Sequence, residues 1–258
     1  RSPGGGFLAG LFHRTDVIVA SSPQFFPTVS AWALSVCKRR PWVFELRDLW
    51  PESVTAVGAV KPGRVIRLFE KLEMFLYRHA TAIVAVSPAF GRKLVGRGID
   101  SRKISIVTNG VDRALFPPQG RDENLARELG LTDKFVIGYI GTHGMAHGLD
   151  FIVHSLAKVT DPRIHFLFIG DGAEKRRCVA HAQELGLANV TFLAPVPKGD
   201  VARYLSVTDA ALVPLRKSDT FLSVIPSKIF ESASMRKPIL LGVGGQANRT
   251  LGYIQRAT

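Results

Sequence analysis

Two charged residues near the end of the chain have the types and spacing needed to bind a phosphorylated ligand. Lys228 and Glu231 occur in the stretch 224–231, between an apolar strand and an apolar helix. Pro226 fits the first turn of that helix, because its missing N–H would have no partner there. The free N–H groups of the helix end and Lys228 could hold the phosphates of a nucleotide, while Glu231 accepts hydrogen bonds from ribose hydroxyls. An ordinary surface helix with a Lys/Glu pair would show the same pattern.

A glycine-rich loop, 141–148, is the second candidate for a phosphate contact. It follows a strand expected over 135–140 and precedes a helix expected over 149–158. Glycines let backbone N–H groups approach a phosphate closely, but the spacing matches neither the dinucleotide-binding fingerprint nor the P-loop. His143 and His147 could donate hydrogen bonds to phosphate or sugar. The alternative is a glycine-rich turn with solvated histidines.

Asp48 is the candidate for catalysis or substrate orientation in the first half of the chain. It follows the expected strand 42–46, at the edge where a parallel sheet binds its ligands. A capping aspartate paired with Arg47 explains the same residues equally well.

Two further strand ends carry turn residues. The segment 169–174 contains Gly170, Asp171 and Gly172 and is more typical of a structural turn than of a ligand contact. The segment 194–197 places Val196 between two prolines and could present its backbone to a nucleotide base.

Short β-branched runs alternate with longer amphipathic segments from one end of the chain to the other, which is typical of parallel sheets covered by helices. The expected strands are 16–20, 42–46, 82–86, 103–108, 135–140, 165–169, 190–193, 210–214 and 239–243. A turn-rich connector at 116–122 divides this pattern. We therefore expect an α/β fold of two Rossmann-like domains, 1–117 and 118–258.

One amphipathic helix, expected over 64–78, carries charges of both signs opposite its apolar face. We expect it to pack on its own sheet. Binding to a membrane surface is the alternative, although such helices are usually more basic.

The composition bounds the class of partner. The chain has 258 residues, of which 46% are hydrophobic, and a formal net charge of +13, which favours an anionic partner. No nucleic-acid-binding signature or basic arm accompanies that charge, so phosphorylated substrates at a membrane surface explain it better. Cys37 and Cys178 lack the spacing of a metal site or redox pair, and no other metal-binding motif is present, which favours a reducing compartment.

The chain reads as a fragment. Its first methionine is Met74, and it stops within an expected helix. It has no secretory signal and no apolar run near the ~20 residues that span a membrane. Parts of an active site could therefore lie outside it.

Taken together, these segments resemble bacterial glycosyltransferases of family 4, which have the GT-B fold. The resemblance is carried by Arg47–Ser53, Val86–Phe90, Asn109–Asp112, Gly141–Gly148, Gly170–Gly172 and Pro226–Glu231. The strings RDLWPES and IPSKIFE are most similar to the N-acetyl-fucosamine transferases of O-antigen and capsule synthesis.

The resemblance implies two domains facing across a cleft, here truncated at both ends, and a retaining, metal-independent transfer of a sugar without a cofactor. The donor would be a nucleotide-sugar, UDP-linked by preference, and the acceptor a polyprenol-linked glycan at the inner face of the cell membrane. Asp48 and Glu231 would be catalytic. The donor contacts would be Gly141, Thr142, His147, Val196, Ser227, Lys228 and Glu231.

The chain departs from the family pattern at Ser223, where a second glutamate is common, and at Thr142 and His147, which replace a basic pair. Two alternatives therefore stay open: a sugar-nucleotide 2-epimerase of the same fold, and a nucleotide-sugar-binding module without activity.

Overall fold

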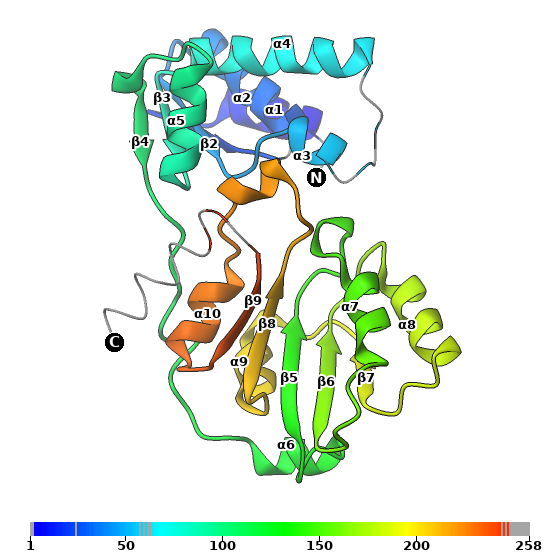
Figure 1. Ribbon diagram of the computed structural model, residues 1–258. Coiled ribbons are helices and arrows are strands. Elements are labelled where there is room, and N and C mark those ends of the chain that lie inside the picture. The colour runs from blue at the N-terminus through cyan, green and yellow to red at the C-terminus, as the bar shows by residue number, and fades with distance from the viewer. Residues whose placement is uncertain are drawn as a thin grey trace. The chain divides into compact units, whose positions relative to one another are not determined.

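The computed structural model of the chain describes residues 3–23, 25–56, 58, 60, 63–243, 245 and 247. It divides into two compact units, each built on its own parallel sheet. Unit 1 comprises Arg1–Asn109 and Ser218–Ile225, and unit 2 comprises Gly110–Lys217 and Pro226–Thr258. The α/β class expected from the sequence is confirmed (Figure 1).

Unit 1 contains a four-stranded sheet whose order along the sheet, β1-β2-β3-β4, is also the order along the chain. The strands are β1 (Ile18–Ser21), β2 (Trp42–Leu46), β3 (Ala82–Ala85) and β4 (Ile104–Ile106). The helices are α1 (Pro3–Phe12), α2 (Phe25–Lys38), α3 (Glu52–Ala56), α4 (Arg64–His79) and α5 (Pro88–Gly96), with the short helices η1 (Ser101–Lys103) and η4 (Asp219–Ser223).

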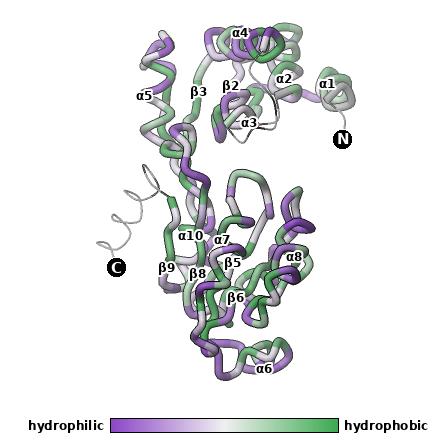
Figure 2. Tube along the Cα trace, turned by 45° about the vertical axis from the view of Figure 1, so that its right-hand side comes forward, coloured by the Kyte–Doolittle hydropathy of each residue, from purple (hydrophilic) through white to green (hydrophobic). Residues whose placement is uncertain are grey.

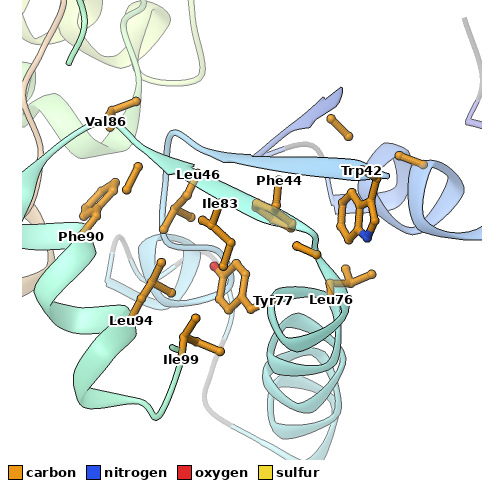
Figure 3. Close-up of a cluster of buried hydrophobic side chains, with 14 of the residues drawn as sticks. Trp42, Phe44, Leu46, Leu76, Tyr77, Ile83, Val86, Phe90, Leu94 and Ile99 are labelled. Carbon is orange, nitrogen blue, oxygen red and sulfur yellow. The ribbon is translucent and has the colours of Figure 1, made fainter. Parts of the chain in front are cut away.

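The core of unit 1 joins the sheet to helices α4 and α5 (Figure 3). Phe44 and Ile83 from the strands meet Leu76 and Tyr77 of α4, and all four side chains are almost completely buried. The remaining residues of α4 alternate in polarity along its length (Figure 2). The expectation that this amphipathic helix packs on its own sheet is confirmed.

Unit 2 contains a five-stranded parallel sheet with the order β7-β6-β5-β8-β9. The strands are β5 (Phe135–Ile140), β6 (Ile164–Ile169), β7 (Val190–Leu193), β8 (Ala210–Pro214) and β9 (Ile239–Gly242). The helices are α6 (Glu123–Glu128), α7 (Leu149–Leu156), α8 (Lys175–Glu184), α9 (Val201–Ser206) and α10 (Lys228–Ser234), with the short helices η2 (Met145–His147) and η3 (Lys198–Asp200).

The strand order of unit 2 fixes where a ligand can bind. The chain runs outward from β5 through β6 to β7, then returns to the other side of β5 to form β8 and β9. The connections therefore diverge between the carboxyl ends of β5 and β8, which is the position where open α/β sheets bind their ligands. The glycine-rich loop follows β5, and the segment that leads to Lys228 follows β8.

Each of the nine strands expected from the sequence overlaps an observed strand. The compact units divide between Asn109 and Gly110, and the segment Ser218–Ile225 belongs to unit 1. A domain boundary between 117 and 118 stays a prediction. Within the described residues, no helix combines the length and the apolar character that crossing a membrane requires.

Candidate functional site

Lys228 lies directly over the start of the glycine-rich loop. Gly141 has a φ of +140°, and a Cβ atom added there would come within 2.7 Å of Nζ of Lys228. The same Nζ lies 5.0 Å from the centroid of the Tyr139 ring. Glycine is favoured at this position by the backbone conformation, and a side chain there would displace the end of Lys228. The structure therefore brings Gly141 and Lys228 together, as the sequence predicts.

The short helix that carries Lys228 begins later than the sequence suggests. Pro226 lies ahead of α10, where its carbonyl accepts a hydrogen bond from the N–H of Ile229, and Ser227 is an exposed cap residue. The expectation that Pro226 occupies the first helical turn is wrong, because the chain makes one turn before the helix starts. Burial lowers the pKa of Lys228, and the nearby carboxylate of Glu231 opposes that shift. Both side chains line one small cavity against β5 and β8.

A second loop locks the glycine-rich loop in place. The N–H of His143 donates to the carbonyl of Asp171, and the N–H of Glu174 donates to the carbonyl of His143. A Cβ atom at Gly170 would lie 2.0 Å from the carbonyl oxygen of Gly141, so only glycine permits this approach. The segment 169–174 thus has the structural role that its composition favours.

His143 lies in the interior of unit 2. Its side chain is completely buried, and neither ring nitrogen has a hydrogen-bond partner. The ring packs against Tyr139, Phe168 and Phe192. Burial, reinforced by the positive charge of Lys175, lowers its pKa to about 4. The expectation that both histidines of the loop reach a ligand is therefore wrong for His143, and so is the alternative of a solvated side chain.

His147 is half-buried, and one of its ring nitrogens is already used. Nδ1 lies 3.2 Å from the carbonyl oxygen of Pro214, so it carries the proton and donates. Burial and the charge of Lys228 lower the pKa of His147 to about 4, which keeps the ring neutral. Its Nε2 is therefore an acceptor, suited to a hydroxyl rather than to a phosphate.

The remaining donor-contact candidates lie around the same sheet edge. Thr142 is exposed, and its carbonyl accepts a hydrogen bond from the hydroxyl of Tyr139. Val196 is half-buried and packs on the core cluster that includes Leu167 and Ile169. Arg216, which the sequence analysis did not single out, donates its N–H to the carbonyl of Ala146. Its place just after β8 is the signal that could have found it.

Asp48 in unit 1 is held by a buried serine that the sequence analysis missed. The hydroxyl of Ser22 accepts hydrogen bonds from the N–H groups of Arg47 and Asp48 and donates to the carbonyl of Asp48. Burial raises the pKa of the Asp48 carboxyl, although hydrogen bonds from Ser53 and from the N–H of Leu49 lower it. No ion pair joins Asp48 to Arg47 in the part of the chain described here, so the alternative of a capping aspartate paired with Arg47 is wrong in its pairing, and the capping role stays a prediction.

Other motif residues near Asp48 stabilise unit 1 internally. The Glu52 carboxylate accepts from Nζ of Lys93 at 2.5 and 2.6 Å and from the Thr220 hydroxyl at 3.2 Å. The hydroxyl of Ser87 accepts from the N–H of Phe90, capping α5, and donates to the carbonyl of Ser223. These contacts hold η4 within unit 1. Within the described residues, no three His, Cys, Asp or Glu side chains are grouped so that they could hold a metal ion.

Two family models match the chain, one over each part of it. Residues 7–110 match the Glycosyl transferase 4-like domain, and residues 134–251 match the Glycosyl transferases group 1 domain. Each of the two parts of the chain thus matches one glycosyl transferase domain model. The 4-like domain contains Asp48, and the group 1 domain contains Gly141, His147, Lys228 and Glu231.

The chain is also similar in sequence to named proteins. The chain is 27% identical over 235 residues to the "Probable glycosyltransferase WbjE" of Pseudomonas aeruginosa, covering 90% of this chain and 58% of that protein. It is 26% identical over 199 residues to the alpha-galactosylglucosyldiacylglycerol synthase of Streptococcus pneumoniae, covering 72% of this chain and 50% of that protein. The chain thus spans little more than half the length of these relatives.

Solved structures confirm the fold. The chain superposes on Anabaena Alr3699/HepE in complex with UDP and glucose with a TM-score of 0.76 and 17% identity, covering 99% of this chain and 71% of that one. The two glycosyl transferase domains therefore have the GT-B type of fold. The N-acetyl-fucosamine branch receives no such support.

Proposed function

We propose that the protein containing this chain is a retaining glycosyltransferase of family 4 that transfers a sugar from a UDP-linked donor to a lipid-linked glycan. It would act in cell-surface polysaccharide synthesis at the inner face of the membrane, and the RDLWPES and IPSKIFE strings favour an N-acetyl-fucosamine donor. The single observation that carries the proposal is the position of Lys228, held over Gly141 at the switch point of the group 1 domain.

The chemistry of that position suits a leaving nucleoside diphosphate. Negative charge develops on the diphosphate as the bond to the sugar breaks, and a fixed ammonium group stabilises it. In the described part of the chain, no hydrogen bond or salt bridge occupies Nζ of Lys228, so its protons are available to phosphate oxygens. We assign to Glu231 the ribose hydroxyls, and to Gly141, Thr142 and Ser227 the phosphates.

The other assignments follow the same logic. The acceptor nitrogen of His147 suits a hydroxyl of the donor. Val196 would lie near the base, and Asp48, whose burial raises its carboxyl pKa, would orient the sugar and acceptor. Charge stabilisation by Lys228 and backbone N–H groups would make a metal ion unnecessary. Solved relatives with UDP bound support the choice of donor class.

The test is product analysis with the complete protein and a panel of UDP-sugars. A transferase releases free UDP only when an acceptor is present, whereas an epimerase converts the donor without releasing UDP. Glu231→Ala is expected to abolish the release, with Glu184→Ala, an exposed residue at the end of α8, as the matched control. Full activity of Glu231→Ala would refute the site assignment.

A further inference from the structure

Tyr139 connects the two parts of the candidate diphosphate site. It is the last but one residue of β5, and its side chain is completely buried. Its hydroxyl donates to the carbonyl of Thr142 at 2.5 Å, and its ring lies 5.0 Å from Nζ of Lys228. We propose that Tyr139 is a positioning residue that holds both Lys228 and the glycine-rich loop in place for a nucleoside diphosphate. This inference rests on the proposed function.

The ring adds a second favourable contact for the Lys228 ammonium group, beside the charge of Glu231. Desolvation makes a charged lysine unfavourable, and burial does lower the pKa of Lys228. The face of an aromatic ring attracts a cation, and that attraction is larger where water is excluded. A ring also leaves the N–H protons of the ammonium unused, whereas a carboxylate at the same place would compete with phosphate. Tyr139 thus supports the charge of Lys228 without consuming its hydrogen bonds.

The hydroxyl of Tyr139 acts separately from the ring. Its hydrogen bond fixes the direction in which the glycine-rich loop leaves β5. The Thr142–His143 peptide is held on one side by Tyr139 and on the other by the carbonyl of Asp171, which accepts from the N–H of His143. A peptide bonded at both its oxygen and its nitrogen cannot rotate. The backbone groups beyond it are therefore presented in one orientation, which is the condition for binding phosphate without reorganisation.

Lys228 and the titratable groups around it change their protonation in different pH ranges. Glu231 attracts the ammonium, whereas His143 and His147 have pKa values lowered to about 4 and stay neutral above pH 6. Burial raises the pKa of Tyr139 itself, so this ring keeps its proton. The uracil N–H of UDP also titrates on the alkaline side, but it does so alike for every variant. A difference between variants in the alkaline loss of affinity therefore reports the deprotonation of Lys228.

The test is a double-mutant cycle on the complete protein, with the affinities for UDP, GDP and ADP measured by calorimetry. Tyr139→Met removes the ring but keeps an apolar side chain, Tyr139→Phe removes only the hydroxyl, and each is combined with Lys228→Ala. Tyr139→Met, which removes the hydroxyl together with the ring, should weaken the binding of UDP about thirtyfold alone, but only about threefold, the cost of the hydroxyl, when Lys228 is already alanine. Tyr139→Phe should cost about threefold in both backgrounds, because it acts through the loop.

The pH profile separates positioning from packing. In Tyr139→Met the alkaline loss of affinity should move to lower pH, because the Lys228 ammonium no longer lies over an aromatic ring. In Tyr139→Phe the ring remains, so the pH of this loss should not change. Equal losses for Tyr139→Met in both backgrounds, with an unmoved profile, would mean that Tyr139 only fills the core and would overturn the inference. Circular dichroism checks folding, and Tyr139→Leu replaces Tyr139→Met if that variant does not fold.

The same data separate the inference from the proposed function. If the unmodified protein binds none of the three nucleotides, the proposed function fails, and this inference fails with it. If the unmodified protein binds one of them but the cycle is additive, only the role of Tyr139 is refuted.

Discussion

His143 is expected to make the protein sensitive to mild acid. Its ring is completely buried without a hydrogen-bond partner, and its pKa is lowered from 6.5 to about 4. In the unfolded chain the same ring takes up a proton near its ordinary pKa of 6.5, whereas in the folded state it takes up a proton only near pH 4. The contribution of His143 to stability is therefore complete above about pH 6.5 and is lost as the pH falls towards 4.

The size of this loss follows from the two pKa values. A shift from 6.5 to about 4 corresponds to about 2.5 kcal/mol of lost unfolding free energy at pH 4.5 relative to pH 7.5. His143→Leu keeps a similar volume among the surrounding aromatic rings and removes the titration. The variant should therefore lose about 2.5 kcal/mol less than the unmodified protein between these two pH values.

Urea denaturation followed by far-ultraviolet circular dichroism at pH 7.5 and 4.5 measures this difference. Other titrating groups are common to both proteins, and His143 makes only the smallest contribution to the pKa of His147, so these groups nearly cancel. His13→Gln, at an exposed position, is the matched control and should behave like the unmodified protein. Identical losses in His143→Leu and the unmodified protein would mean that His143 is hydrated or protonated in the folded state and that it does not cause the acid sensitivity.

Three further predictions follow from the packing of each unit and the proposed roles. Gly170→Ala should destabilise unit 2 by about 3 kcal/mol in urea denaturation, because its Cβ would lie 2.0 Å from the Gly141 carbonyl oxygen. Unchanged stability would mean that the loop at Gly170 does not pack tightly on the loop at Gly141. Arg97→Met should cost about 3–5 kcal/mol, because it leaves the buried Glu73 carboxylate without its 2.8 Å partner, and adding Glu73→Gln should recover most of that loss. Asp48→Asn should leave the UDP affinity within about twofold but lower the transfer rate at least about 100-fold, and a parallel loss of affinity would place Asp48 in the donor site instead.

The fold could be predicted from the sequence because buried parallel strands have a local signature. Runs such as Phe135–Ile140 and Ala210–Pro214 are apolar on both faces, and glycine or polar segments end them. The segment Ser218–Ile225 was not predictable in this way. It belongs to unit 1 through side-chain contacts, such as that of Thr220 with Glu52, which no local pattern encodes.

The candidate site was predictable in its parts but not in its connections. Spacing alone pointed to Lys228 and to the loop at Gly141, since both follow strands that meet at one edge of the sheet. Nothing in the spacing showed that His143 would be buried or that Tyr139 would lie under the Lys228 ammonium group. The burial of His143 depends on side chains from β5, β6 and β7, and the Tyr139–Lys228 contact joins β5 to α10. Both arise only in the folded unit.

The most direct test of the donor site is the thermal stabilisation of the complete protein by UDP, GDP and ADP. A nucleotide at about 100 times its dissociation constant should add about 2.7 kcal/mol of stability. We expect that one of the three nucleotides, UDP first among them, stabilises the protein and that Lys228→Ala removes the effect. Lys158→Ala, at an exposed position after α7, should preserve it. Stabilisation that survives in Lys228→Ala, or a folded protein that responds to none of the nucleotides, would contradict this expectation.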